Sequence, residues 1–352
     1  MSTLVCRYPD HCPVLETWIV SQRQCVDIDM EIVFLGTSAG VPTRKRNVTA
    51  AALKKQSGKA WYLIDCGEGT QHRVLQTPLS LHRLEAVFIT HVHGDHCYGL
   101  PGLLASASMA GRRHALTIIA PASIRDFLDA IQATTGLHLT FPLEFVAVEA
   151  MDVSLRLPDF AVEPVKLSHG VASYGFVFHE RGVESRLDTE RLDTLGVPRG
   201  PDWGRLHRGE DVTLDNGTQV RSEDVLLPER PARKVVICGD NDDPLRLETA
   251  CRGASLLVHE ATYTEDVVER LGTDNQHSTA AAVATFAQTM ALPNLILTHF
   301  SPRYHDNRQA TPNIDDVERE ARSHYRHTLY LARDLETYRL SRDGEVHRVE
   351  WP

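Results

Sequence analysis

The segment HVHGDH at residues 91–96 has the residue types and the spacing of a metal site. Three histidines and one aspartate occur within six positions, directly after the apolar run AVFIT at residues 86–90. Imidazole nitrogens and carboxylate oxygens are the ligands that suit zinc and similar divalent ions. We expect a buried strand to deliver the first histidine, and Gly94 to permit the tight turn that folds the later side chains back beside it. The first two histidines can then bind one ion, while the aspartate and the last histidine bind a second.

Further ligand candidates each follow directly on an apolar, strand-like run, as His91 does. These residues are His169, Asp240 and His299. Strands of one layered sheet system end along a common edge, so residues that follow them can converge. Asp240 is the best candidate to bridge two ions, because a carboxylate offers two oxygens and offsets shared positive charge. The predicted ligand sets are His91, His93, His169 and Asp240 for one ion, and Asp95, His96, Asp240 and His299 for the other.

A pair of metal ions roughly 3.5–4 Å apart is suited to hydrolysis. The ions lower the pKa of a bridging water, hold the electrophile and stabilise charge on the attacking and leaving oxygens. Asp95 is placed to orient that water or to accept its proton. Glu260 ends another apolar run and His277 opens a helix-like stretch, so this Glu–His pair can donate a proton to the departing alkoxide. The sequence therefore predicts a metal-dependent hydrolase with Asp95, Glu260 and His277 as its catalytic residues.

The composition is that of a globular protein with no membrane segment. The 352 residues are 42% hydrophobic, and no run approaches the roughly 20 apolar residues that a membrane span requires. Seven cysteines without a CxxC pair suit a reducing cytoplasm rather than a disulfide framework. The net charge of −10 argues against a nucleic-acid partner but does not exclude one, because local fields matter more than the total.

Residues 1–29 and 180–232 stand apart from the rest of the chain. From residue 30 onwards, strand-like and helix-like runs alternate, and several strands are apolar on both faces, which predicts α/β layers with helices covering the sheets. We expect residues 1–29 to be a poorly ordered extension and residues 30–352 to form the catalytic domain. The charged, turn-rich segment 180–232 interrupts the pattern and predicts a protruding arm with a small hairpin at Asn216-Gly217.

The arm and one loop near the first strand carry candidate RNA contacts. Basic residues outnumber acidic ones between residues 199 and 208, and an indole among them could stack on a base or a ribose. A basic triplet at residues 44–46 could contact substrate phosphates. These candidates are Arg44, Arg46, Arg199, Trp203, Arg205 and Arg208. Composition alone favours a solvated loop for both segments.

Eight sequence blocks together resemble ribonuclease Z, the tRNA 3′-processing endonuclease of the metallo-β-lactamase superfamily, in its short bacterial form. The blocks are FLGTSAGVPTRKRNVTA (34–50), LIDCGEGTQH (63–72), FITHVHGDHCYGLPGLLAS (88–106), HGVASYGF (169–176), VVICGDN (235–241), HEATY (259–263), HSTAAA (277–282) and LTHFSPRY (297–304). The HxHxDH block alone marks only the superfamily, whereas the HEAT and HST blocks and the arm are specific to ribonuclease Z. Two residues depart from the family's pattern: Asn241 replaces a common threonine and Ala172 replaces a common proline.

The resemblance implies an αββα sandwich, two zinc ions per subunit and a homodimer, with manganese or iron as alternative metals. It places the family's ligands on the seven residues predicted above, its water-activating aspartate on Asp95, and its acid pair on Glu260 and His277. It makes the arm, with a glycine-proline tip at Gly200 and Pro201, an exosite that clamps tRNA. The implied reaction uses a bridging hydroxide to remove the 3′ trailer from precursor tRNA, leaving a tRNA 3′-hydroxyl and a trailer 5′-phosphate.

Two other functions stay open from the residues alone. A hydrolase of the same superfamily acting on a small ester or cyclic phosphodiester would share the metal ligands, but it would not need the arm or His277. A non-catalytic RNA-binding protein on the same fold would not need the complete set of ligands that this chain has.

Overall fold

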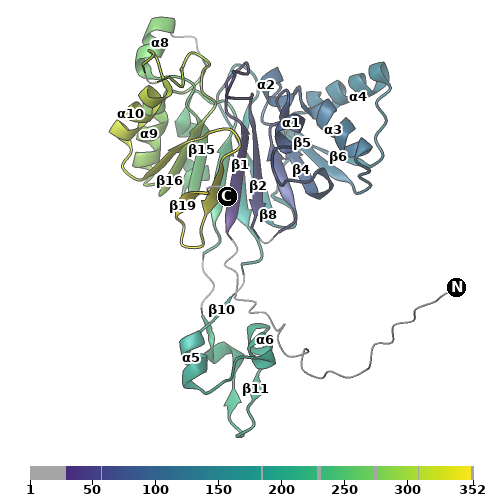
Figure 1. Ribbon diagram of the computed structural model, residues 1–352, viewed down its shortest axis with the longest axis vertical. Coiled ribbons are helices and arrows are strands. Elements are labelled where there is room, and N and C mark those ends of the chain that lie inside the picture. The colour runs from purple at the N-terminus through teal and green to yellow at the C-terminus, as the bar shows by residue number, and fades with distance from the viewer. Residues whose placement is uncertain are drawn as a thin grey trace, which may run out of the picture.

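The computed structural model describes residues 29–56, 58–183, 185–227, 231–272, 276–307 and 309–349. Two stacked sheets covered by helices form a body, and a small arm projects from it (Figure 1). The predicted N-terminal extension lies outside the described residues except for Asp29. Within the described part of the chain, no helix combines the length and the apolar character needed to cross a membrane.

The first sheet is mixed and has eight strands. In spatial order these are β19 (Val346–Val349), β18 (Thr337–Leu340), β1 (Met30–Gly36), β2 (Ala50–Lys55), β3 (Trp61–Ile64), β4 (Leu84–Phe88), β5 (Leu116–Ala120) and β6 (Leu143–Ala147). The helices packed on its outer face are α1 (Thr70–Val74), α2 (Gly94–Cys97), α3 (Leu100–Met109) and α4 (Ser123–Thr135). The short 3₁₀ turns beside it are Leu81–Arg83 and Val148–Ala150.

The second sheet has seven strands. In spatial order these are β17 (Thr328–Leu331), β16 (Asn294–Thr298), β15 (Leu256–Glu260), β14 (Lys234–Cys238), β9 (Tyr174–Glu180), β8 (Phe160–Lys166) and β7 (Leu155–Arg156). The helices packed on its outer face are α7 (Glu248–Cys251), α8 (Glu265–Leu271), α9 (Ala280–Thr289) and α10 (Ile314–His324), with a 3₁₀ turn at Pro244–Leu247. The layers therefore follow the order helix, sheet, sheet, helix.

Successive side chains of the central strands point to opposite faces of their sheet, so apolar residues contribute alternately to the core between the sheets and to the core under the helices. In β1, Phe34 belongs to the core between the sheets, whereas Val33 packs with the outer helices. Aromatic rings fill the space between the sheets, where the Phe88 ring lies 4.9 Å from that of Phe176 and 5.2 Å from that of Phe178. Because both faces of each sheet are covered, the central strands are apolar runs in the sequence.

The carboxyl ends of several strands meet at one edge of the body, which we call the carboxyl edge. Strands β8, β14, β15 and β16 run in the same direction, because β9 lies antiparallel between β8 and β14. The end of β4 in the first sheet joins them, since the Tyr174 N–H donates to the Thr90 carbonyl at 3.0 Å. Residues that follow these strands are therefore brought together, as the sequence predicts.

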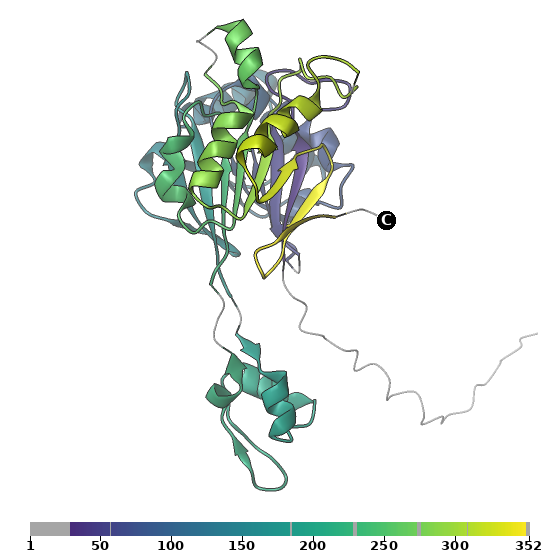
Figure 2. The same cartoon turned by 90° about the vertical axis from the view of Figure 1, so that its left-hand side faces the viewer.

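The arm is inserted between β9 and β14 and leaves the body at the edge opposite to the carboxyl edge. Its elements are β10 (Arg186–Leu187), α5 (Thr189–Thr194), α6 (Pro201–His207), β11 (Val212–Thr213), β12 (Gln219–Val220), a 3₁₀ turn at Ser222–Asp224 and β13 (Leu226–Leu227). A small core of its own includes Leu192, Leu206 and Val220. Figure 2 shows the arm standing clear of the body on a narrow stalk.

A buried cluster of charges fixes the place where the arm joins the body. Glu180 ends β9, and its two carboxylate oxygens accept from the Arg233 guanidinium at 2.8 and 3.1 Å. The Lys55 ammonium lies 3.7 Å from the same carboxylate, and all three side chains are less than a tenth exposed. Arg233 also donates to the Leu340 carbonyl at 2.7 Å, which ties the stalk to the first sheet.

We predict that Glu180→Gln destabilises the protein by about 3–5 kcal/mol, because it removes the carboxylate charge that faces two buried cations. Urea denaturation measures this change. The matched control is Glu223→Gln, which alters an exposed pair with Arg221 at 3.3 Å and should change stability by at most about 0.5 kcal/mol. Equal, small effects for both variants would contradict a structural role for the buried cluster.

Candidate metal centre

The structure brings the seven predicted ligands together at the carboxyl edge. In the first group, the His93 Nδ1 lies 3.1 Å from the Nε2 of His91 and 3.2 Å from the Nε2 of His169. One oxygen of Asp240, Oδ2, lies 3.6 Å from the His91 nitrogen and 3.7 Å from the His169 nitrogen. Four donor atoms thus surround one position, and we call them the first donor set.

The second donor set forms on the other side of Asp240. The Nε2 atoms of His96 and His299 are 3.3 Å apart, and each lies 3.4 Å from Asp240 Oδ1. Asp95 Oδ2 lies 3.5 Å from the His96 nitrogen and 3.4 Å from the His299 nitrogen. The two oxygens of one carboxylate therefore face the two sets, which is the bridging arrangement predicted for Asp240.

The donor spacing fits divalent metal ions. Ligands about 2.0–2.1 Å from a tetrahedral zinc ion lie about 3.3 Å from one another. The separations in both sets, 3.1–3.7 Å, match that value. Imidazole and carboxylate donors without thiolate suit zinc, manganese or iron. The residues therefore fit a pair of divalent ions.

Each of three ligand imidazoles has a hydrogen-bond partner on the side that points away from the metal position. This partner holds the ring in the tautomer whose other nitrogen, facing the metal position, carries no proton. The Nδ1 of His91 lies 3.0 Å from Thr90 Oγ1, and that of His169 donates to the Gln276 carbonyl at 2.9 Å. His299, at a positive φ of 57°, has its Nδ1 3.0 Å from Thr262 Oγ1. Such partners orient a ligand and raise its basicity.

Asp65 is a functional residue that the sequence analysis did not identify. It follows β3, is buried, and its Oδ2 lies 2.7 Å from His96 Nδ1. The same carboxylate accepts from the N–H and hydroxyl of Thr90 at 2.8 and 2.9 Å. Its place after an apolar strand, within the LIDCGEG block, is the same signal that identified the other ligands.

Burial and neighbouring charges set the protonation of the donors. Burial lowers the pKa of His91 to about 2, so its imidazole is neutral and free to bind a cation. Burial alone raises the pKa of Asp240, but the His299, His96 and His91 imidazoles outweigh it and hold that pKa well below its usual value. For Asp95, burial likewise raises the pKa, but hydrogen bonds from His299 and His96 hold it below the usual value. Both carboxylates are therefore anionic and stabilise bound cations.

The predicted acid pair lies beside the donor sets. His277 Nδ1 is 3.1 Å from both carboxylate oxygens of Glu260. The His277 ring centroid lies 5.2 Å from that of His169 and 5.5 Å from that of His299, so the ring adjoins both sets. Burial lowers the pKa of His277, but the Glu260 carboxylate outweighs burial and raises that pKa to about 9. The imidazolium is thus a proton donor held at the centre.

The chain is similar along most of its length to curated ribonucleases Z. The ribonuclease Z of Pseudomonas putida F1 is 53% identical over 315 residues, which cover 90% of this chain and 98% of that protein. That of Prochlorococcus marinus MIT 9313 is 37% identical over 316 residues, covering 89% and 98%. The chain belongs to the ribonuclease Z family. A family model described as anti-Pycsar protein Apyc1 also matches residues 30–186.

Solved structures agree with this family and with the predicted fold. The short form of human tRNase Z is 25% identical, with a TM-score of 0.59 over 87% of this chain and 98% of that chain. The metallo-β-lactamase fold protein YhfI of Bacillus subtilis is 18% identical, with a TM-score of 0.62 over 88% and 99%. The αββα sandwich predicted from the sequence is thus confirmed, and family and donor sets together imply a divalent metal.

The two predicted phosphate contacts beside the first strand differ in the structure of this chain. Arg44 is exposed in the loop whose Gly40 N–H donates to Asp95 Oδ2 at 2.8 Å. Arg46 is buried and donates to Thr37 and to the Ala332 carbonyl at 2.7 and 2.9 Å. Its guanidinium also lies over the Phe300 ring. The prediction for Arg46 as a substrate contact is therefore wrong, because its charge serves to hold the loop.

The predicted stacking residue of the arm has a different role. The Trp203 indole is half-buried, donates to the Val197 carbonyl at 3.2 Å, and has the Arg199 guanidinium 5.3 Å from its ring centroid. It therefore stabilises the loop before α6 and does not present a free ring face, which corrects the stacking prediction. Gly200 and Pro201 are exposed at the start of this helix.

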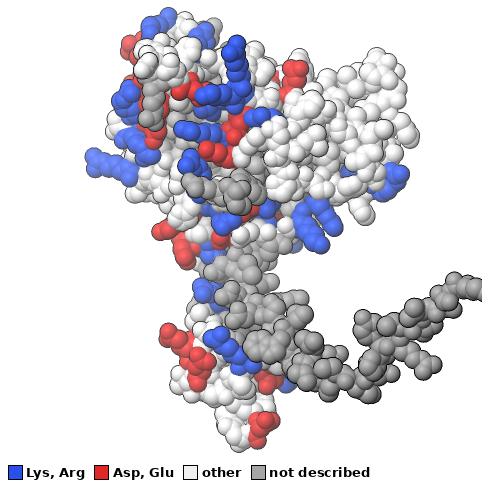
Figure 3. Space-filling view, in the orientation of Figure 1, with Lys and Arg blue, Asp and Glu red and all other residues white. Residues whose placement is uncertain are grey.

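The remaining basic residues of the arm are partly neutralised. Glu210, just beyond the stretch considered in the sequence, lies 3.4 Å from Arg205 and 3.0 Å from Arg208. Figure 3 shows acidic and basic side chains interspersed on the visible face of the arm. An RNA contact here therefore depends on exposed guanidinium groups that already have acidic neighbours.

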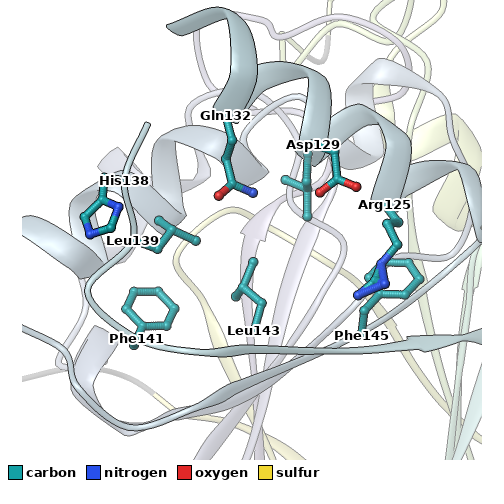
Figure 4. A pocket seen from close by; sticks show the side chains of 9 residues that line it. Arg125, Asp129, Gln132, His138, Leu139, Phe141, Leu143 and Phe145 are labelled. Atoms are coloured by element: carbon teal, nitrogen blue, oxygen red, sulfur yellow. The ribbon is translucent and has the colours of Figure 1, made fainter. Parts of the chain in front are cut away.

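The cavities of the body differ in their relation to the donor sets. One of about 270 Å³ lies between α4 and β6, where Phe141, Leu143 and Phe145 form its apolar floor and Arg125 its rim (Figure 4). No predicted site residue lines it. A recess of about 500 Å³ borders His169 and includes the cationic Lys166 and Arg246. Only this second recess adjoins the metal centre and suits a phosphate-bearing substrate.

We predict that His277 in the metal-free protein titrates with a pKa of about 9 and that Glu260→Gln lowers this pKa, because burial then acts without the carboxylate. The ion pair stabilises the fold fully below pH ~6.5, and its contribution is lost as pH rises through about 9. NMR titration of the imidazole measures both pKa values. In the control, Glu163→Gln beside the half-buried His179, the His277 pKa stays unchanged. An unshifted pKa in Glu260→Gln would contradict the pairing.

Proposed function

We propose that this chain is the endoribonuclease that removes the 3′ trailer from precursor tRNA. The products are a tRNA ending in a 3′-hydroxyl and a trailer beginning with a 5′-phosphate. The observation that carries the proposal is the pair of donor sets on either side of the Asp240 carboxylate, in a member of the ribonuclease Z family. Two Zn²⁺ ions per subunit fit these donors, with Mn²⁺ or Fe²⁺ as alternatives.

Two divalent cations bound here supply a nucleophilic water with a lowered pKa and offset the charge that develops on the phosphate. The first donor set is held by His91, His93 and His169, and the second by Asp95, His96 and His299, with Asp240 between them. The carboxylate of Asp95 receives a hydrogen bond from the Gly40 N–H, which fixes its orientation beside the attacking water. The Asp95 carboxylate would then orient that water and take up its proton.

The leaving group is the 3′-oxygen of the tRNA, which needs a proton as the P–O bond breaks. His277 is 19% exposed and its Nδ1 lies on the Glu260 carboxylate, and we assign its imidazolium as the group that protonates that oxygen. Glu260 holds the imidazole and stabilises its positive charge until transfer. Attack and departure thus use different groups, the Asp95 carboxylate as the base and the His277 imidazolium as the acid.

We further propose that the arm is the tRNA exosite and acts across a homodimer in the cytoplasm. The arm leaves the body at the edge opposite to the metal centre, so it is directed away from the site of its own subunit. A partner subunit could bring its own arm to that site, which supports the dimer implied by the sequence motifs. The four described cysteines are free and buried, in keeping with a reducing compartment.

The cleavage site tests the proposal directly. A precursor tRNA transcript incubated with the protein should be cut once beyond the acceptor stem, giving a 3′-hydroxyl and a 5′-phosphate, and a chelator should stop the reaction. Asp95→Ala should reduce the rate by about 10²–10⁴-fold, the range of a positioned base, with tRNA binding and folding retained. Asp126→Ala on the exposed side of α4 is the control. Normal turnover by Asp95→Ala, or cleavage unaffected by chelator, would refute the mechanism.

Deletion of the arm separates substrate recognition from hydrolysis. Replacing residues 185–227 with a short Gly-Ser linker removes the paired strands β10 and β13 as one unit. We expect kcat/KM for precursor tRNA to fall about 100-fold or more. This is the size of the gain in affinity that a linked second binding module provides. Hydrolysis of bis(p-nitrophenyl) phosphate should be unchanged, because the donor sets lie at the opposite edge. Equal losses on both substrates would show that the arm supports the body rather than binding tRNA.

A further inference from the structure

Asn241 lies at the centre of the hydrogen bonds behind the metal centre. It follows the bridging Asp240 and is completely buried. Its backbone N–H donates to Glu260 Oε1 at 2.7 Å, and its carbonyl accepts from the Ser278 hydroxyl at 2.6 Å. Ser278 is the neighbour of His277, so both members of the acid pair are tied to this backbone. The two variants tested below, Asn241→Ala and Asn241→Thr, keep the backbone groups that make these two contacts.

The side-chain amide makes two further contacts, one with each of its polar atoms. Oδ1 accepts from the Ser168 N–H at 3.0 Å, immediately before the ligand His169. Nδ2 donates to His259 Nε2 at 2.9 Å. The His259 Nδ1 lies 2.7 Å from the Glu260 carbonyl, which can only accept, so Nε2 carries no proton and needs a donor.

These contacts demand a donor and an acceptor on separate atoms. An amide has both and can reach the ends of β8 and β15 at once, whereas a single hydroxyl offers one oxygen on a shorter side chain. Without the amide, the part-buried Ser168 N–H and the buried His259 Nε2 lose their partners. The turn that carries His169 would then be free to move relative to Glu260.

We propose that Asn241 is a positioning residue whose side-chain amide sets the distance between the metal ligand His169 and the Glu260–His277 pair. The inference rests on the proposed metal centre, and it assigns the amide a function that a single hydroxyl at this position cannot fulfil in the same way. The amide acts through His169 and His259 and does not touch the substrate.

Zinc affinity, measured by competition with a chromogenic chelator, tests this role without any substrate. We expect Asn241→Ala to lower the affinity for the more weakly bound zinc ion about 10–100-fold. This is the usual effect of losing a contact that orients a ligand. At saturating zinc, kcat for precursor tRNA should fall by a similar factor with KM unchanged, because the exosite is untouched. Asn241→Thr offers one hydroxyl in place of the amide, so the zinc affinity of this variant should lie between those of the wild type and of Asn241→Ala.

A matched control separates positioning from stability. Asn294 is equally buried at the start of β16, where its Nδ2 donates to the Ser255 and Gly344 carbonyls at 2.7 and 2.6 Å. Asn294→Ala should lower the melting temperature as Asn241→Ala does, but leave zinc affinity and kcat unchanged. Where Asn241→Ala does not fold, Asn241→Thr decides.

Wild-type zinc affinity or kcat in Asn241→Thr and Asn241→Ala would overturn the proposal, as would an equal loss in Asn294→Ala. Wild-type protein that binds no zinc would instead refute the proposed metal centre itself.

Discussion

The metal centre depends on one buried carboxylate whose two oxygens face two sets of donors. Asp240 carries a negative charge in a place where burial alone would protonate it, and the surrounding imidazoles reverse that preference. The same atoms that stabilise its charge leave two positions framed by nitrogen and oxygen atoms 3.1–3.7 Å apart. Bound cations would replace protons among these groups, so metal binding and proton release are coupled.

The fold holds this arrangement through residues that do not themselves face a metal position. Asp65 connects His96 with Thr90 from the first sheet, and Thr262 connects His299 with Glu260 from the second. The imidazole rings therefore have partners on both sides, which limits their rotation. Because Thr262 touches both a ligand and the acid pair, the groups that attack the phosphate and those that protonate its leaving oxygen belong to one connected network.

The arm and the metal centre lie at opposite edges of the body, which is why we propose that one binds the substrate and the other carries out the hydrolysis. The arm leaves the body at the amino end of β14, whereas Asp240 lies just beyond its carboxyl end. The arm has its own small core, and the buried Glu180–Arg233 pair fixes where it begins. Trp203 and Arg46, which as residue types suggest RNA contacts, instead stabilise the arm and the loop near the metal centre. Residue type therefore predicts an RNA-binding surface less well than do the contacts that its basic and aromatic side chains already make within the protein.

The sequence by itself determined the class of fold and the ligand candidates. Apolar runs that lead to His91, Asp240 or His299 indicate both a covered sheet and its functional edge, because a strand buried on two faces has few polar residues until it ends. The strand that leads to His169, β8, is partly exposed and contains Glu163 and Lys166. The tertiary structure alone decided which partners hold these ligands. Asp65, Thr262 and Asn241 are 31 to 73 positions from their partners His96, His299 and Ser168. No local periodicity reports such distant contacts; they arise only when two sheets stack and bring their strand ends within hydrogen-bonding distance.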